Sequence, residues 1–275
     1  MTKPKIACLG PSGSFSENTL QATLGHQPFD IIFADDLRDL LTDLQNRSSD
    51  FIWLPWWNSG CGFLQDRLQE EFLLTIARSN NDYKIVADSF TALKFSLLAL
   101  PGTTLRDIKT IYVNPYTNSL CKQFFREHPQ LTQLVKRSSS EAAKAVAAEN
   151  DRSIAASANI QSAALYGLEV LKESMLAPEE EAVMQFVLLA RHDTPRPFTI
   201  KNNHLVTSCV VYSHDKHELS ASNHLKIQTI RHSTLDPSIH LLDLEGSVEH
   251  AHLKTIFGNC LVHYFGCYPT SGKKQ

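Results

Sequence analysis

Residues 5–17, KIACLGPSGSFSE, decide the fold: an apolar run of strand length ends in a turn of Gly, Pro and Ser, and a helical pattern opens at Ser16 and Glu17. A turn of small residues leaves room for a ligand against bare backbone, and the free N–H groups at the start of a helix attract a carboxylate or phosphate. The stretch therefore predicts an anion cradle. The plainer alternative is an ordinary strand–turn–helix connection.

Short apolar segments alternate with segments of helical periodicity through the first two thirds of the chain. Strands are predicted at residues 5–10, 29–34, 51–55, 84–88, 95–99, 110–113 and 153–157. Helices are predicted at residues 16–24, 36–46, 63–70, 117–127, 140–149 and 159–171. This alternation is typical of an α/β fold with parallel sheets.

Two of the predicted helices begin with clear capping signals. Asp36 and Asp39 come just before a series of leucines that share one helix face. Ser138 and Glu141 have the spacing of a capping box. The second signal predicts another helix N-terminus that can receive an anion.

A linker is predicted where Pro195 and Pro197 interrupt the periodic pattern. We expect a first domain at residues 1–194 and a second at residues 200–275. In the second domain, strands are predicted at 205–212, 239–244 and 261–265, and a helix at 247–258. These elements indicate a small α+β domain of a size that can hold its own core or dock as an accessory unit.

Composition narrows the class of protein. The 275 residues are 43% apolar with a net charge of −3, so a nucleic-acid partner is not expected. No apolar stretch approaches the ~20 residues of a membrane span, and the N-terminus lacks signal-peptide features, which favours a cytoplasmic protein without membrane contact. The six cysteines have no CxxC spacing and the twelve histidines no HxxxH or HExxH spacing, so reduced thiols and no metal site are expected.

Five motifs, which follow one another along the chain, resemble the prephenate dehydratase family over nearly the whole chain. They are 10–16, GPSGSFS; 54–62, LPWWNSGCG; Asn114-Pro115-Tyr116 with Cys121; 138–143, SSSEAA; and Ala155-Ala156 leading to 166–168, YGL. Met184-Gln185-Phe186 then stands where the family has Thr-Arg-Phe. The resemblance implies an α/β fold with a two-lobed catalytic domain like a periplasmic binding protein, a ligand in the cleft, and an ACT domain after it.

The resemblance also implies which residues form the site, with prephenate as the ligand and with neither metal nor cofactor. The catalytic candidates are Ser14, Asn58, Ser59, Tyr116 and Met184. The substrate-binding candidates are Ser12, Phe15, Trp57, Gly60, Cys61, Asn114, Ser138, Ser139, Gln185 and Phe186. An apolar wall is expected from Trp56, Trp57, Phe63 and Met184. For the tryptophan pair, the alternative is one ring in the core and one on the surface.

The departures from the family fall at these positions. The family's threonine, implicated in helping the ring hydroxyl leave, is replaced by Met184, whose thioether has no proton to give. The neighbouring arginine is replaced by Gln185, which keeps hydrogen bonding and loses the charge. A glutamate becomes Trp57, and a histidine and a glutamine become Asn114 and Tyr116.

The replaced positions are those of the family's chemically active side chains, whereas the small residues that shape the cleft are retained. This selective replacement predicts changed chemistry. The pattern is similar to that of the non-aromatising prephenate decarboxylases of secondary-metabolite pathways, which also lack the threonine. These enzymes release CO2, keep the ring hydroxyl and give dihydro-4-hydroxyphenylpyruvate. Two alternatives stay open: a dehydratase that makes phenylpyruvate with another acid, and a catalytically silent prephenate-binding protein. Tyr116 is a candidate proton donor; the alternative is a packed residue at a helix start.

The C-terminal domain departs from the ACT pattern as well. Residues 213–229 are too few for the family's Gly-Ala-Leu loop and full helix, and Arg231-His232-Ser233-Thr234 replaces Glu-Ser-Arg-Pro. Residues 243–246 and 265–269 match the ACT ending. We therefore expect a truncated ACT-like scaffold that serves dimerisation or packing, a homodimer, and no regulation by phenylalanine.

Overall fold

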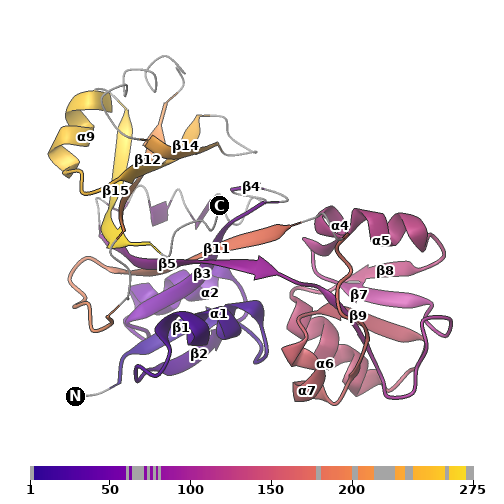
Figure 1. Cartoon of the computed structure of the whole chain (residues 1–275). Coiled ribbons are helices and arrows are strands. Elements are labelled where there is room, and N and C mark those ends of the chain that lie inside the picture. The colour runs from indigo at the N-terminus through magenta and orange to yellow at the C-terminus, as the bar shows by residue number, and fades with distance from the viewer. Residues whose placement is uncertain are drawn as a thin grey trace.

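The computed structural model describes residues 3–59, 62–63, 71–72, 75–76, 79, 82–177, 181–199, 204–213, 227–232, 238–257 and 260–270. Within these residues the chain forms three β-sheets with helices packed on their faces (Figure 1). Two sheets lie in the part of the chain that ends at Arg191, and the third follows it.

The first sheet forms lobe 1. Its strands are β1 (Lys5–Leu9), β2 (Asp30–Ala34), β3 (Phe51–Asn58), β4 (Gly62–Phe63), β5 (Tyr83–Leu93) and β11 (Ala182–Arg191). They lie in the order β2-β1-β3-β11-β5, and β4 pairs with β3. The helices α1 (Phe15–Leu24) and α2 (Leu37–Gln45) pack with different core clusters on the two faces of this sheet. α1 packs with Trp53 and Phe186, and α2 packs with Ile52 and Leu54.

The second sheet forms lobe 2. Its strands are β6 (Ser96–Ala99), β7 (Thr110–Val113), β8 (Thr132–Val135), β9 (Ile154–Ala158) and β10 (Glu169–Lys172), in the order β10-β6-β9-β7-β8. Its helices are α4 (Thr117–Leu120), α5 (Lys122–Glu127), α6 (Ser139–Glu149) and α7 (Gln161–Tyr166). The chain leaves lobe 1 after β5 and returns to it through β11, so the two lobes are joined by two crossings (Figure 1).

The third sheet lies above lobe 1 in the view of Figure 1 and shares a core cluster with it. Its antiparallel strands are β12 (Leu205–Tyr212), β13 (Ile227–His232), β14 (Ile239–Glu245) and β15 (Leu261–Pro269), in the order β13-β14-β12-β15, with α9 (His250–Phe257). Phe265 meets Trp56 of β3 edge to face, with ring centroids 5.5 Å apart. Phe265 and Tyr268 thereby share a core cluster with Ile85 and Val187 of lobe 1.

The starts of α1, α2 and α6 lie within one residue of the predicted ones. The Ser14 hydroxyl accepts a hydrogen bond from the Glu17 N–H at 3.1 Å, and the Ser138 hydroxyl accepts one from the Glu141 N–H at 3.2 Å. Asp36 caps α2 by accepting from two backbone N–H groups of the first turn. These side chains replace the missing intrahelical partners of the first turn, which fixes where each helix begins.

Other predictions are corrected. The sheets are mixed rather than parallel, because β11 runs antiparallel to both β3 and β5, and β6 runs antiparallel to β9 and β10. The single helix expected at 117–127 is broken at Cys121 into α4 and α5. The helix expected at 159–171 ends at Tyr166, where Gly167 takes a left-handed conformation that glycine adopts without strain, and β10 follows.

Most of the helix predicted at 63–70 lies outside the described residues. Of the helices that the structure describes, none is long and apolar enough to cross a membrane.

Candidate functional site

A cavity of about 110 Å³ lies between the two lobes. It is lined by Leu9, Gly10, Ser14, Phe15, Ser16, Pro55, Leu93, Phe95, Asn114, Tyr116, Arg137, Ser138, Ser139, Ser140, Met184 and Phe186. These residues come from the ends of strands, from the loop after β1, and from the first turns of α1 and α6. In a two-lobed α/β fold, such a position at strand ends and helix N-termini is where ligands bind.

Lobe 1 and its crossing strands supply an apolar wall. Phe186 stacks on Trp53 with ring centroids 5.6 Å apart and an interplanar angle of 7°. Phe15 and Phe95 meet edge to face at 5.5 Å. Met184 lies beside them on the same face of β11 and is 6% exposed. A ligand group that contacts this wall loses its water without gaining a charged partner there.

Lobe 2 supplies hydroxyl, amide and guanidinium groups. The Asn114 side chain makes four hydrogen bonds: its Oδ1 accepts from the N–H groups of Tyr116 and Thr117 and from the Thr117 hydroxyl, and its Nδ2 donates to Ser139 Oγ at 3.1 Å. Asn114 therefore fixes the turn before α4 and orients Ser139. Together with the N-terminus of α6, this arrangement suits an anionic or carbonyl oxygen.

Arg137 is a lining residue that the sequence analysis did not select. Its guanidinium contacts Glu141 at 3.3 Å in lobe 2 and Asp35 at 3.5 Å in lobe 1, so it spans the mouth of the cavity. The hydrogen bond to Glu141 raises the pKa of Arg137. In the sequence, its place directly before the predicted cap at Ser138 is a signal that it shares with many exposed charges.

The loop after β1 joins the lobes. The Gly13 carbonyl accepts from Asn159 Nδ2 at 2.6 Å and from Ser162 Oγ at 3.2 Å, and the Ser12 carbonyl accepts from the Tyr166 hydroxyl at 2.7 Å. Gly13 has φ of +82°, and a Cβ there would lie 2.6 Å from a methyl group of Leu165. Glycine is thus required at this position by both backbone conformation and space.

Two predicted substrate-binding residues lie elsewhere. Gln185 is on the opposite face of β11 from Met184 and Phe186, and its Nε2 donates to Asp88 Oδ2 at 2.9 Å. Trp57 packs partly buried against the cluster shared with the third sheet, and Trp56 is a buried member of that cluster. None of these three residues lines the cavity, so neither the hydrogen-bonding role predicted for Gln185 nor the apolar wall predicted for the tryptophans is placed there. Alternation of side chains along a strand puts Gln185 and Trp56 at the back, and a bulge in β3 opposite Gln185 and Phe186 puts Trp57 on the same side as Trp56.

The remaining predicted residues have other places. Asn58 is buried at the end of β3, paired with Met184, and Ser59 is exposed, with its hydroxyl bonded to the backbone of Glu181 and Val183. Ser12 bonds Glu17 through its hydroxyl at 2.9 Å. None of the three is among the lining residues. Gly60, Cys61 and the side chain of Phe63 lie outside what the structure describes.

The structure brings eight of the predicted residues together around the cavity. They are Ser14, Phe15, Asn114, Tyr116, Ser138, Ser139, Met184 and Phe186. Of the lining residues, Tyr116 and Arg137 are the ones with titratable side chains, and the described lining contains neither a carboxylic acid nor a histidine. Elsewhere in the described chain, no three His, Cys, Asp or Glu side chains are grouped so that they could hold a metal ion.

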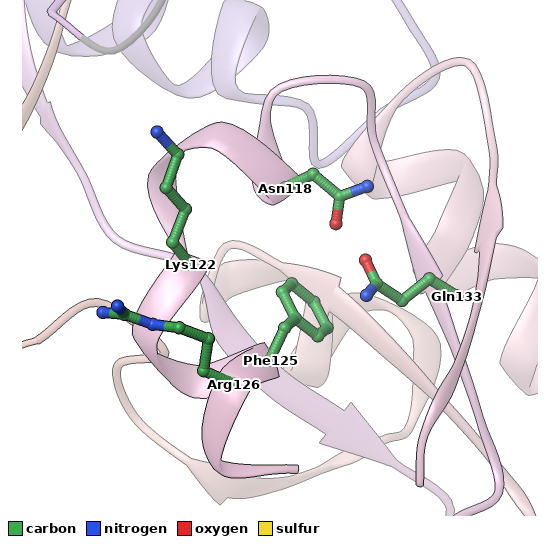
Figure 2. A pocket seen from close by; sticks show the side chains of 5 residues that line it. All are labelled: Asn118, Lys122, Phe125, Arg126 and Gln133. Carbon is green, nitrogen blue, oxygen red and sulfur yellow. The ribbon is translucent and has the colours of Figure 1, made fainter. Parts of the chain in front are cut away.

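A larger open hollow of about 500 Å³ lies on lobe 2, lined by Asn118, Lys122, Phe125, Arg126 and Gln133. Figure 2 shows the amide groups of Asn118 and Gln133 facing each other and the charged ends of Lys122 and Arg126 pointing away from them. All of these residues belong to one lobe, and none carries a motif of the sequence analysis. We therefore take the smaller cavity between the lobes as the candidate site.

A two-lobed α/β domain with a cavity between its lobes defines the periplasmic-binding-protein-like class. Within this class, the chain belongs to the prephenate dehydratase family, because the family model described as Prephenate dehydratase matches residues 6–194.

Curated relatives agree with this assignment. The chain is 27% identical to the bifunctional chorismate mutase/prephenate dehydratase of Buchnera aphidicola subsp. Acyrthosiphon pisum over 80% of this chain and 54% of that protein. It is 28% identical to the prephenate dehydratase of Lactococcus lactis subsp. lactis over 62% of this chain and 58% of that protein. The chain thus spans about half the length of the curated relatives that it matches.

Solved structures share the fold across all three sheets. Prephenate dehydratase from Arthrobacter aurescens in complex with L-Phe superimposes with a TM-score of 0.76 at 23% identity, covering 96% of this chain and 89% of that one. A protein described as GqqA, a novel type of quorum quenching acylase, gives a TM-score of 0.70 at 20% identity, covering 97% and 98%. At these identities the likeness concerns the fold.

Proposed function

We propose that this protein is a prephenate decarboxylase that releases CO2 and leaves the ring hydroxyl attached, giving dihydro-4-hydroxyphenylpyruvate. The observation that carries the proposal is the cavity at Met184: the position where the family has threonine holds a thioether, and the described lining offers no carboxylic acid or imidazole in its place. At the position of the family's threonine there is therefore no group that can give the ring hydroxyl a proton.

The two sides of the cavity suggest the orientation of the substrate. The side-chain carboxylate and ketone of prephenate lie toward lobe 2, near Arg137, Ser138 and Ser139 at the N-terminus of α6. The ring and its carboxylate lie against Phe186 and Met184. An apolar wall favours loss of the carboxylate's charge as neutral CO2.

The proposed step balances without a co-reactant. The bond between the ring carbon and its carboxylate breaks, CO2 leaves, and the electron pair moves into the ring alkenes. A proton is then added at a ring carbon, and the hydroxyl stays in place. Tyr116 is the one phenol of the described lining, and we assign it as the candidate proton donor.

Two alternatives are compatible with the family. A dehydratase would use the departing hydroxyl as the electron sink and give phenylpyruvate, CO2 and water. A silent binding protein would hold prephenate unchanged. Both predict the same cavity residues, so the product distinguishes them.

The test is incubation of the purified protein with prephenate at neutral pH, with a sample without enzyme, followed by mass spectrometry and ultraviolet spectra. The proposal expects a non-aromatic product that is lighter than prephenate by one CO2. Aromatic phenylpyruvate above the control would support the dehydratase, and unchanged prephenate would support the binding protein. If prephenate stays unchanged, calorimetry with prephenate measures whether the protein binds it.

Further expectations accompany this function. We propose that the third sheet is a truncated ACT-like scaffold, that the protein is a cytoplasmic homodimer serving a specialised biosynthetic pathway, and that it uses no cofactor. Most of the shortened loop on which the missing phenylalanine site was predicted, residues 214–226, lies outside the described residues. Calorimetry with millimolar phenylalanine tests that prediction: saturable binding would contradict it.

A further inference from the structure

A buried polar network lies directly behind the cavity. Asp88 of β5 is 2% exposed, and its Oδ2 accepts hydrogen bonds from Gln185 Nε2 and from Thr270 Oγ1, each at 2.9 Å. Gln185 is on β11 and Thr270 directly follows β15. One carboxylate oxygen thus joins both crossing strands of lobe 1 to the third sheet.

The network lies behind the residues that form the cavity floor. Met184 and Phe186, the neighbours of Gln185 in β11, face the cavity while Gln185 faces Asp88. The adjacent strand carries its bulge at the same level, and the extra residue, Trp56, packs on Phe265 of β15. The third sheet therefore contacts the back of the floor in two ways, through a ring contact and through the carboxylate.

We propose that Asp88 and Thr270 are positioning residues for the cavity floor: through Gln185 they hold the register at which Met184 and Phe186 face the substrate. The inference rests on the function proposed above, since it assigns the third sheet a fixed part in that reaction. In this proposal the third sheet holds the cavity floor in position, and it does so without a bound effector.

The expected effect on the cavity floor follows from the stiffness of packed β-strands. Backbone atoms of neighbouring strand residues move together, so a shift of Gln185 tilts the side chains on both sides of it. A displacement near 1 Å in a reacting geometry lowers a rate by up to about 100-fold. The polar groups of lobe 2 that hold the side-chain carboxylate belong to a different sheet, so we expect them to stay in place. The expected signature is a lower kcat with little change in KM.

The central variant is Thr270→Val, which keeps the shape of the side chain and removes its donor. We expect kcat to fall about tenfold, consistent with loss of a hydrogen bond to a charged group, with KM within about twofold. Thr270→Ser retains the hydroxyl and should restore most of kcat. Gln185→Met removes the other donor and should act in the same direction.

Thr207→Val is the matched control. Thr207 is also buried in the third sheet, and its hydroxyl donates to the Gly246 carbonyl at 2.7 Å and accepts from the Val248 N–H at 2.9 Å, away from Asp88. If it lowers kcat as much as Thr270→Val does, the effect is general destabilisation of the sheet and the proposal is overturned. A folded Thr270→Val variant with unchanged kcat overturns it as well. Should Thr270→Val fail to fold, Gln185→Met decides by the same kcat criterion.

A second readout does not depend on turnover. The chain has three tryptophans, Trp53, Trp56 and Trp57, and all of them lie in β3. Intrinsic emission therefore reports on the floor and its bulge. We expect a shift in emission for Thr270→Val and none for Thr207→Val, and the absence of a difference overturns the proposal. If the wild type does not convert prephenate, the proposed function fails, and the emission still decides the positioning role.

Discussion

The two sides of the cavity differ in chemistry. Lobe 1 faces it mainly with rings, methyl groups and the Met184 thioether, whereas lobe 2 faces it with Asn114, Arg137 and a run of serines at the start of α6. A symmetrical polar cleft would hold a dianion equally at both ends. Here the substrate can be anchored at one end and left unsolvated at the other. Under the proposed function, this asymmetry favours loss of a carboxylate over simple binding.

The largest expected effect tests the polar side. Arg137→Ala removes the guanidinium from the mouth of the cavity, and we expect kcat/KM to fall about 10- to 100-fold, mainly through KM, because a charge-assisted hydrogen bond to the substrate is lost. Steady-state kinetics with prephenate measure it.

The control is Arg126→Ala, which removes an equal charge from the hollow of Figure 2 on the same lobe. Equal losses in the two variants would mean that Arg137 acts only through the general field of the lobe. Arg137 would then not be a specific binding group for the substrate on the lobe 2 side of the cavity.

The sequence predicts this comparison only in part, and the reasons are local. The strand, turn and helix at residues 5–24 follow from short-range signals, namely an apolar run, small residues and a serine cap. Gln185 was misplaced because the family motif was read as a unit, although alternation along β11 puts its middle residue at the back.

Other features depend on distant pairing. The bulge that turns Trp57 away from the cavity exists only because β3 pairs with β11, and no motif within β3 predicts it. β11 itself was not predicted as a strand, although it lies between β3 and β5 in the first sheet. Arg137 resembles any exposed charge beside a helix cap until its contact with Asp35 across the lobes is seen.

The second prediction tests whether the two sides must be closed on each other. Gly13→Ala places a side chain at positive φ and against Leu165, and we expect the free energy of unfolding to fall by about 1–2 kcal/mol. It should also weaken prephenate binding, because the loop bonds lobe 2 through the Gly13 carbonyl. Chemical denaturation and calorimetry measure the two effects.

Gly25→Ala separates these effects. Gly25 also has a positive φ, of +59°, and a Cβ there would meet no atom within 4 Å. It should cost stability without a change in prephenate binding. If both variants lose binding equally, contact between the lobes at Gly13 is not what shapes the cavity.

The third prediction tests the apolar side. Met184→Thr returns a hydroxyl to the position where the family has threonine, and we expect phenylpyruvate to appear beside the non-aromatic product, with a slower total rate. Met184→Leu keeps the wall apolar and should change the rate without changing the product. Product ratios by mass spectrometry decide. The same product ratio in both variants would show that the side chain at position 184 does not determine whether the ring hydroxyl leaves or stays.

The smallest effect concerns the hydrogen bond from the Tyr166 hydroxyl in lobe 2 to the Ser12 carbonyl in lobe 1. Burial raises the pKa of Tyr166, and the charge of Glu17 adds to the shift. The folded state therefore holds this proton more tightly than the unfolded chain does. Its contribution to stability is complete below the ordinary tyrosine pKa near 10 and is lost as the pH rises through the higher folded value.

Tyr166→Phe should lower the free energy of unfolding at neutral pH by about 1 kcal/mol or less and should flatten the loss of stability at alkaline pH. Tyr112→Phe is the comparison, because the Tyr112 hydroxyl bonds Glu149 within lobe 2, a contact that raises its pKa to about 12. Both variants lose an alkaline titration, and only Tyr166→Phe loses a bond between the lobes. Denaturation from pH 7 to 11 with small-angle scattering separates them: equal scattering profiles would leave Tyr166 without a part in closure.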